Sequence, residues 1–251
     1  MDNLKPLVSV VTPVFNSSKF IRDCIISVKG QTYENWELLL VDDCSTDDSI
    51  HIIKEEAADD KRISLVQLDK NSGPAAARNK ALTMARGKYI AFLDSDDIWL
   101  PEKLETQLHF MISNNISFSF TEYSFIDEEG NELDKLVRIP AEVDYSFLLK
   151  NTIIGCLTVM LDKEAFGNIQ MPDLKRRQDY AMWLALLRTG CKAYGLQKKL
   201  AMYRVVNGSH SSNKLKAVKA TWEVYEFERL GFLKACWCFS NYLVNAIRKR
   251  M

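Results

Sequence analysis

The 251-residue sequence has no excess of charge of either sign, since 33 Lys and Arg residues balance 33 Asp and Glu residues. A chain without a basic field is not expected to bind nucleic acid. Its six cysteines show no paired spacing of the kind that ligates metal ions. We interpret them as reduced thiols in a cytosolic protein, because a chain of this length needs no disulfide bridges.

Other absences narrow the class of protein further. The start, MDNLKPLVSVVTP, lacks a charged leader followed by a long apolar run and a small-residue cleavage site, so we expect a cytoplasmic rather than a secreted protein. Neither GxGxxG nor GxxxxGK[ST] occurs, which argues against a dinucleotide oxidoreductase and against a P-loop kinase or ATPase. The uncharged run of the tail, 235–247, is shorter than the roughly 20 residues that a membrane-spanning helix needs.

The first half of the sequence alternates between strand-like and helix-like stretches. Runs rich in Val, Ile, Leu and aromatic residues, each ending at a polar or Pro-containing turn, predict strands at 7–15, 36–43, 63–69 and 88–96. Helical spacing predicts helices between them, at 18–29, 46–58 and 74–86. This order predicts an α/β fold, a mostly parallel sheet covered on both faces, with ligands at the carboxyl ends of the strands.

Acidic residues gather where two of these predicted strands end. Asp42 and Asp43 close the second strand, and the Asp-Ser-Asp-Asp run at 94–97 closes the fourth. A helix cap uses a single carboxylate, whereas several crowded together repel one another unless a cation relieves them. Carboxylate oxygens suit Mg²⁺ or Mn²⁺, which keep open positions for phosphate oxygens. The pattern therefore favours a metal-diphosphate site at Asp94 and Asp96.

The loop after the third predicted strand, NSGPAAARNKAL (71–82), has features of a phosphate-binding turn. Gly73 permits an unusual backbone angle, Pro74 suits a first helical turn, and the alanines allow close approach of a ligand. Arg78 follows on the predicted helix, where a cation near a helix start is an ordinary phosphate-binding arrangement. An ordinary solvated helix face fits the same residues equally well.

Three stretches together resemble the nucleotide-binding half of a family 2 glycosyltransferase with the GT-A fold. They are the stretch from VSVVTPVFN to VDDCSTDDS (8–49), NSGPAAARNKAL (71–82) and GKYIAFLDSDDIWLPEKLETQ (87–107). They follow the family's order over about the first 110 residues. The resemblance implies a GT-A domain with a nucleotide-binding half, an acceptor half and a helical tail, at 1–110, 111–214 and 215–251.

The resemblance also implies which residues bind the donor nucleotide. The turn that lies against the base and ribose corresponds to Pro13, Val14, Phe15 and Asn16. Asp43 resembles the residue that hydrogen-bonds the uracil ring of a UDP-linked donor. Arg78 corresponds to a basic residue near the nucleotide.

The triplet Asp94, Ser95 and Asp96 looks like the family's Asp-x-Asp motif. The resemblance implies that Asp96 is the direct ligand of Mn²⁺ or Mg²⁺, and that Asp94 assists from nearer the ribose. Asp97 extends the motif, and we expect it to support a loop. The segment YRVVNGSHSSNK (203–214) is similar to a family loop that closes over the diphosphate with Arg204, His210 or Ser212, although a solvent loop is the equal alternative.

Transfer to a hydroxyl group requires a base, because an alcohol is a poor nucleophile at neutral pH. The stretch LKRRQDYAMWLALLRTG (174–190) has a helical rhythm, and Asp179 stands where the helix begins, so it is either a helix cap or a functional acid. Inverting family members carry an acidic pair before aromatic and Trp positions, and QDYAMW matches with Gln178 replacing the first acid. The resemblance implies that Asp179 is the catalytic base.

The tail, GFLKACWCFSNYLVNAIRKRM (231–251), joins an apolar aromatic segment to a basic end. An interfacial helix drawn to anionic lipid fits this composition. A terminal helix docked on the domain, or on the twin subunit of a homodimer, fits it equally well. If the tail contacts lipid, we expect the protein on the cytoplasmic face of the inner membrane.

These features together predict a metal-dependent, inverting glycosyltransferase. We expect it to move a sugar from a UDP-linked nucleotide-sugar donor to a hydroxyl group of a glycan or lipid-linked glycan acceptor in bacterial surface polysaccharide synthesis. Gln178 keeps open a non-catalytic nucleotide-sugar-binding protein on the same fold. A sugar nucleotidyltransferase is a further alternative, but it needs a glycine-rich loop after the first strand, and TPVFNSSKF contains no glycine.

Overall fold

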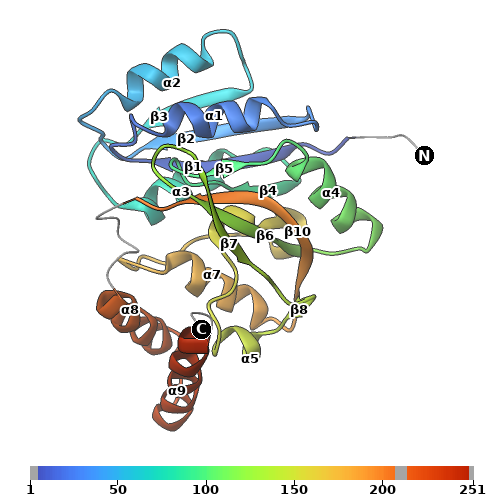
Figure 1. The fold of residues 1–251 in the computed structure, drawn as a ribbon, viewed down its shortest axis with the longest axis vertical. Helices are drawn as coiled ribbons and strands as arrows, with labels where there is room; N and C mark the ends of the chain where they lie inside the picture. The colour runs from blue at the N-terminus through green and yellow to red at the C-terminus, as the bar shows by residue number, and fades with distance from the viewer. Residues whose placement is uncertain (1–4, 207–213, 249–251) are drawn as a thin grey trace.

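A computed structural model describes residues 5–206 and 214–248 (Figure 1). Its strands are β1 (Val8–Val14), β2 (Trp36–Asp42), β3 (Ile63–Gln67), β4 (Tyr89–Phe92), β5 (Ile98–Trp99), β6 (Phe118–Ile126), β7 (Glu132–Val137), β8 (Glu142–Val143), β9 (Met160–Asp162) and β10 (Ala193–Arg204). Its helices are α1 (Ile21–Lys29), α2 (Ser49–Ala57), α3 (Pro74–Met84), α4 (Lys103–Ser113), α5 (Tyr145–Leu148), the 3-10 turn η1 (Cys156–Thr158), α6 (Lys163–Phe166), α7 (Gln178–Leu187), α8 (Lys214–Phe227) and α9 (Phe232–Arg248).

The strands form one mixed sheet in the order β3-β2-β1-β4-β9-β6-β10-β5, with β7 paired to β6 and β8 to β10. The four strands predicted in the first half pair in parallel, as expected for strands joined by helices. β9 runs antiparallel to both β4 and β6, so the second half of the sheet is mixed. The predicted α/β fold, with a parallel arrangement of the strands in its first half, is therefore confirmed.

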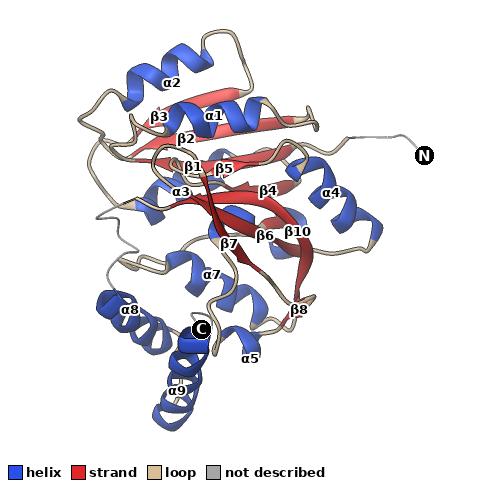
Figure 2. Cartoon of the chain, in the orientation of Figure 1, coloured by secondary structure: helices blue, strands red, loops and turns tan. Residues whose placement is uncertain are grey.

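Helices cover both faces of the sheet because each buried strand is apolar on both sides (Figure 2). Alternate residues of β1 point to opposite faces: Val8 and Val10 lie in one core with α1 and α4 residues, and Val11 lies in the other core with α3 and α7 residues. Both cores flank β1 and β4, which places the carboxyl ends of these central strands on a rigid support.

β10 is a strand that the sequence did not indicate. Its twelve residues pair in parallel with β6 through two register shifts, and the polar run Gln197–Lys199 lies where the pairing is irregular. A polar interruption of this kind hides the period-2 pattern of a strand. The structural consequence is that Arg204, at the end of β10, lies beside the turn that follows β4.

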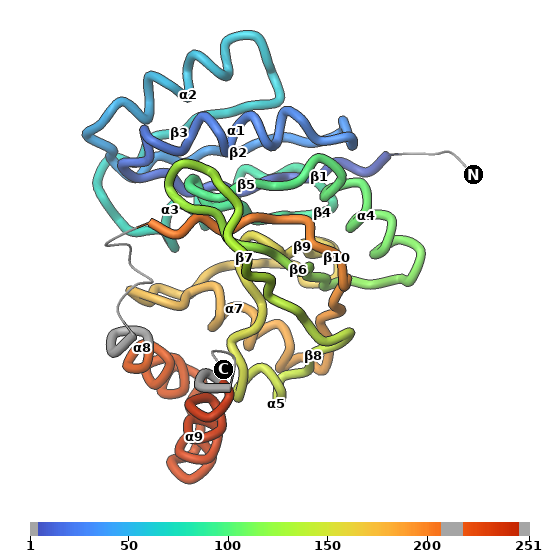
Figure 3. Tube along the Cα trace, in the orientation of Figure 1, coloured from blue at the N-terminus to red at the C-terminus, as the bar shows by residue number. Residues whose placement is uncertain are grey.

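The tail packs on the rest of the protein through α8 and α9. The hydroxyl group of Tyr225 donates to the carbonyl of Leu149, and Nδ2 of Asn245 donates to the carbonyl of Lys150 at 3.1 Å. Both helices lie at the end of the molecule away from α2 (Figure 3). No helix among the described residues is long and apolar enough to cross a membrane. α8 begins at Lys214, next to the predicted boundary, and the division into domains stays a prediction.

Candidate active site

The turn after β1 is fixed to the turn after β2. The N–H of Asn16 donates to Oγ of Ser45 at 2.9 Å, and Oδ1 of Asn16 accepts from the N–H of Thr46 at 2.8 Å. Pro13 and Val14 are buried within β1, so within the predicted base-binding turn only Phe15 and Asn16 are exposed. Phe15 is 50% exposed, which leaves an aromatic ring available to a ligand at this edge of the sheet.

Asp43 joins the end of β2 to the loop before α3. Its carboxylate accepts hydrogen bonds from the N–H of Ser72 at 2.6 Å and from the N–H of Gly73 at 2.8 Å. Gly73 has a φ of 86°, in the region that favours glycine, and this backbone angle turns the chain into α3. The structure thus gives Asp43 a loop-ordering contact, and its predicted contact with a uracil ring stays a prediction.

Arg78 and Asp94 form an ion pair between α3 and the turn after β4. Arg78 is 7% exposed, so the alternative of a solvated helix face is wrong for this residue. Burial is the largest single effect and lowers the pKa of its guanidinium, but the charges of Asp94, Cys156 and Asp179 and the hydrogen bond to Asp94 together raise the pKa overall. Nε of Arg78 is buried and has no hydrogen-bond partner among the described residues.

The remaining acids of the 94–97 run differ in their surroundings. Asp96 is partly exposed, and burial together with the charge of Asp94 raises its pKa to about 6. Asp97 is fully buried, and burial followed by the charges of Asp96 and Asp94 raises its pKa well above the usual value. Ser95 shares a hydrogen bond of 2.7 Å with the hydroxyl of Ser17, which ties the run to the start of the β1–α1 connection.

Arg204 binds the backbone around this acidic run. Its Nε donates to the carbonyl of Asp96 at 2.9 Å, and its Nη2 donates to Oδ2 of Asp23 at 3.0 Å. Nη1 donates to the carbonyls of Asp127 and Glu128 at 3.3 and 3.1 Å. Arg204 is 1% exposed, so the guanidinium positions the Asp96 turn, and its predicted direct contact with the donor stays a prediction. His210 and Ser212 lie outside the described residues.

Asp179 stands in the first turn of α7 and does not cap that helix. The cap position belongs to Arg177, whose φ is 58°, so the interpretation of Asp179 as an N-cap is wrong. Burial raises the pKa of the Asp179 carboxyl and Asp94 raises it further, while Arg78 opposes the shift. The charge of Arg78 therefore acts on Asp179 as well as on its ion-pair partner Asp94, and the assignment of Asp179 to the donor site stays a prediction.

The residues present fit a metal ion that is held jointly with a diphosphate. No group of three or more His, Cys, Asp or Glu side chains among the described residues is arranged to hold a metal by itself. Mg²⁺ and related ions are commonly held by one or two carboxylates, with water and substrate phosphates completing the coordination. The raised pKa of Asp96 fits this use, since a cation would stabilise its charged form.

The 3-10 turn η1 is held in place by two residues that the sequence did not single out, Trp99 and Gln107. Nε1 of Trp99 donates to the carbonyl of Leu157 at 2.8 Å, and Nε2 of Gln107 donates to the carbonyl of Thr158 at 2.9 Å. These bonds fix η1, which contains Cys156. Burial raises the pKa of the Cys156 thiol well above its usual value, as expected for a small buried residue and not for a nucleophile. The available signal was the position of Trp99, two residues after the acidic run.

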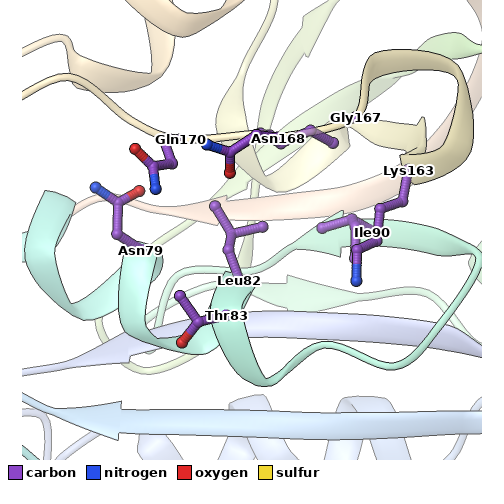
Figure 4. A pocket seen from close by; sticks show the side chains of 9 residues that line it. Asn79, Leu82, Thr83, Ile90, Lys163, Gly167, Asn168 and Gln170 are labelled. Carbon is purple, nitrogen blue, oxygen red and sulfur yellow. The ribbon is translucent and has the colours of Figure 1, made fainter.

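A small cavity lies on another side of α3, away from the strand ends. Its volume is about 60 Å³, far below the roughly 300 Å³ at which ligand pockets begin. It lies between α3 and the segment after α6 (Figure 4) and is lined by Asn79, Leu82, Thr83, Ile90, Lys163, Gly167, Asn168, Ile169 and Gln170. None of the predicted donor residues lines it, so we do not place a substrate there.

Comparison with known proteins gives extensive similarity in sequence. The model of glycosyl transferase family 2 matches residues 9–192. The chain is 54% identical over 252 residues to a glycosyltransferase named for teichuronic acid biosynthesis, TuaG of Bacillus subtilis (strain 168), with all of both chains covered. It is 39% identical over 244 residues to WfgD of Escherichia coli, named a UDP-Glc:alpha-D-GlcNAc-diphosphoundecaprenol beta-1,3-glucosyltransferase, covering 97% of this chain and 94% of WfgD.

Solved structures share the fold at much lower identity. S. aureus TarS 1-349 in complex with UDP-GlcNAc matches with a TM-score of 0.72 and 21% identity, over 94% of this chain and 71% of that chain. The mannosyltransferase PcManGT from Pyrobaculum calidifontis, in complex with GDP-Man and Mn2+, matches with a TM-score of 0.71 and 17% identity, over 96% and 74%. These likenesses concern the fold alone, and they confirm the predicted GT-A fold.

Proposed function

Because the chain belongs to glycosyl transferase family 2, as its sequence motifs predicted, we propose that it transfers a sugar from a UDP-linked donor to a hydroxyl group of a lipid-linked glycan. The relatives support the acceptor class: TuaG is named for teichuronic acid biosynthesis, and WfgD is named as acting on a diphosphoundecaprenol-linked sugar. The product is accordingly a building block of a bacterial surface polysaccharide.

The observation that carries the proposal is the ion pair between the buried Arg78 of α3 and Asp94 in the turn after β4, and the charge of Arg78 also opposes the raised pKa of Asp179 at the start of α7. We therefore place the carboxylate of Asp179 near a donor diphosphate that binds beside Asp94. Asp179 accepts the proton of the acceptor hydroxyl while its oxygen attacks the anomeric carbon of the donor sugar. The bond from that carbon to the nucleoside diphosphate breaks on the opposite face, which inverts the anomeric configuration.

The departing nucleoside diphosphate gains negative charge, and we expect Arg78 and a bound metal ion to stabilise that charge. Arg78 contributes the charge of a nearly buried guanidinium, whose electrostatic effect is stronger there than in water. Asp96 and Asp94 would hold Mn²⁺ or Mg²⁺, which supplies Lewis-acid stabilisation of the leaving phosphate oxygens. The exposed ring of Phe15 and the ordered loop on Asp43 offer the base a stacking surface and a polar edge.

The experiment measures release of nucleoside diphosphate from the purified chain. UDP-Glc, UDP-GlcNAc and GDP-Man are each supplied with an undecaprenyl-diphosphate-linked monosaccharide, with Mn²⁺ or with EDTA. We expect UDP release that needs both the acceptor and the metal, and a product whose new glycosidic bond has the opposite anomeric configuration to the donor. Metal-dependent nucleotide binding without turnover on any acceptor would support the non-catalytic alternative. Preference for GDP-Man would overturn the UDP assignment.

A further inference from the structure

The outward face of α9 is an uncovered apolar surface. Leu233, Trp237 and Val244 follow the helical repeat along one side of α9, and Phe232 lies beside them. Leu233 is 83% exposed and Trp237 is 67% exposed. Large apolar side chains that are exposed side by side, rather than singly, mark a surface that binds a partner. We call these four residues the α9 outer face.

The inward side of α9 is already satisfied by the protein. Ala235, Cys238 and Tyr242 are buried, and the hydroxyl of Tyr242 accepts a hydrogen bond of 3.0 Å from Nη2 of Arg177. The ring of Phe239 packs edge-on against Trp222 of α8 with centroids 5.4 Å apart. α9 is therefore docked on the domain, as one of the two alternatives for the tail predicted. The α9 outer face is the side of the helix that remains available to a partner.

The charge of this end of the sequence selects the partner. The sequence of α9, Phe232–Arg248, contains two basic residues, Lys234 and Arg248, and no acidic residue. A second copy of the same surface would bring these like charges together. An anionic phospholipid surface instead complements them, while Trp and Phe rings suit the headgroup region and Leu and Val suit the acyl boundary.

We propose that the α9 outer face binds the surface of an anionic phospholipid membrane. The helix lies along the interface and does not span it, in agreement with its length and with the side chains that dock on the domain. The proposal goes beyond sugar transfer, since binding of lipid needs neither donor nor metal. It also gives a geometric consequence: the contact between Tyr242 and Arg177 couples the membrane-bound helix to the start of α7, which carries Asp179.

The test uses the full chain and sedimentation with vesicles. Wild type is expected to bind vesicles of phosphatidylglycerol and phosphatidylethanolamine, and to bind phosphatidylcholine vesicles weakly. Leu233→Glu/Trp237→Glu should lower the partition coefficient about tenfold or more, because two acids enter the apolar face and oppose the anionic surface. The matched control is Ile26→Glu/Ile112→Glu, which places the same two acids at exposed apolar positions on α1 and α4 and should leave the partition coefficient unchanged.

Two further measurements keep the result clear. UDP binding in the presence of Mn²⁺ should be equal in wild type and both double variants, which separates loss of the lipid contact from loss of the donor site. The second measurement uses Trp237→Phe, which keeps the apolar character of the surface. Brominated phosphatidylglycerol should quench the tryptophan fluorescence of this variant less than that of wild type. Failure of wild type to bind anionic vesicles would overturn the proposal. Wild-type vesicle binding by Leu233→Glu/Trp237→Glu would also overturn it. A third contrary outcome is a wild-type dimer that does not bind vesicles and that Leu233→Glu/Trp237→Glu dissociates.

Discussion

The buried carboxylate of Asp97 accepts a hydrogen bond of 2.9 Å from the backbone N–H of Arg204, which lies 107 positions further along the chain. The side chain of Arg204 returns to the same turn and binds the carbonyl of Asp96. The end of β10 and the acidic turn after β4 are therefore one structural unit. The position of Asp96, the expected metal ligand, depends on a guanidinium that the chain supplies from its second half.

Replacing Arg204 by Met should destabilise the fold and weaken the donor site together. The change removes the donor to the carbonyls of Asp96, Asp127 and Glu128 and a cation that stabilises the charge of the buried Asp97, so we expect the free energy of unfolding to fall by about 3 kcal/mol. Urea denaturation measures this loss. Arg22→Met is the matched control, since Arg22 also pairs with two acids but at the surface, and its urea midpoint should hardly move. Equal midpoints for the two variants would contradict the positioning function of Arg204.

Asp43→Asn separates two functions of one carboxylate. Asn keeps one acceptor, but its amide nitrogen faces a backbone N–H, so the loop at Ser72 and Gly73 loses order. We expect nucleotide binding to weaken by about 1–3 kcal/mol, as measured by calorimetry with UDP and GDP. If Asp43 also contacts the uracil ring, UDP loses more affinity than GDP. Equal losses would restrict Asp43 to ordering the loop.

The nucleotide-binding half was predictable because its signals are local. Each of the four strands before Asp94 is an apolar run that ends at a turn, and the helices between them keep a plain helical spacing. The residues at the strand ends, such as Asp43 and Asp94, then meet at one edge because parallel strands must align their carboxyl ends. The edge of the sheet at which these residues lie can therefore be predicted from the order of the strands, whereas their roles in binding stay predictions.

The second half was less predictable because its contacts are long-range. No strand was predicted from the sequence at 193–204, whereas the structure has a bulged strand there that ends at a buried arginine. Nothing near Arg204 in the sequence indicates that its partners are Asp23, Asp96 and Asp127. Gln107 likewise supports η1 from a helix 51 residues away. Such roles depend on how β6 and β10 pair, and a bulged strand without alternation conceals that pairing.

Lys103 should make the stability of the protein depend on pH. The residue is fully buried, with its Nζ donating to Oε1 of Gln107 at 2.7 Å and lying over the ring of Trp99, and burial lowers the pKa of its amine to about 7. Between this value and the ordinary pKa of about 10.4, the unfolded chain binds a proton that the folded chain has released. The free energy of unfolding must therefore rise with pH across this window.

The measurement compares wild type with Lys103→Met, which keeps the length of the side chain and removes the titrating group. From pH 7 to pH 9 the free energy of unfolding of wild type should rise by about 2 kcal/mol relative to the variant. Taking the difference cancels the titration of the cysteines, which occurs in both proteins. Parallel pH curves for the two proteins would show that the amine of Lys103 stays protonated in the folded state.

Asp179→Asn should abolish transfer and leave donor binding intact. The amide cannot accept the proton of the acceptor hydroxyl, so we expect kcat to fall about 10²–10⁴-fold, while UDP affinity with Mn²⁺ stays at the wild-type value.

In wild type the base works only when deprotonated, and its pKa is raised by burial and by Asp94. Activity should therefore fall on acidification through a pKa above the ordinary value for Asp, and the residual activity of the variant should lack this limb. Asp173→Asn, an exposed acid before α7, is the control and should keep the wild-type rate and pH profile. Turnover near the wild-type value in Asp179→Asn would show that another group takes the proton.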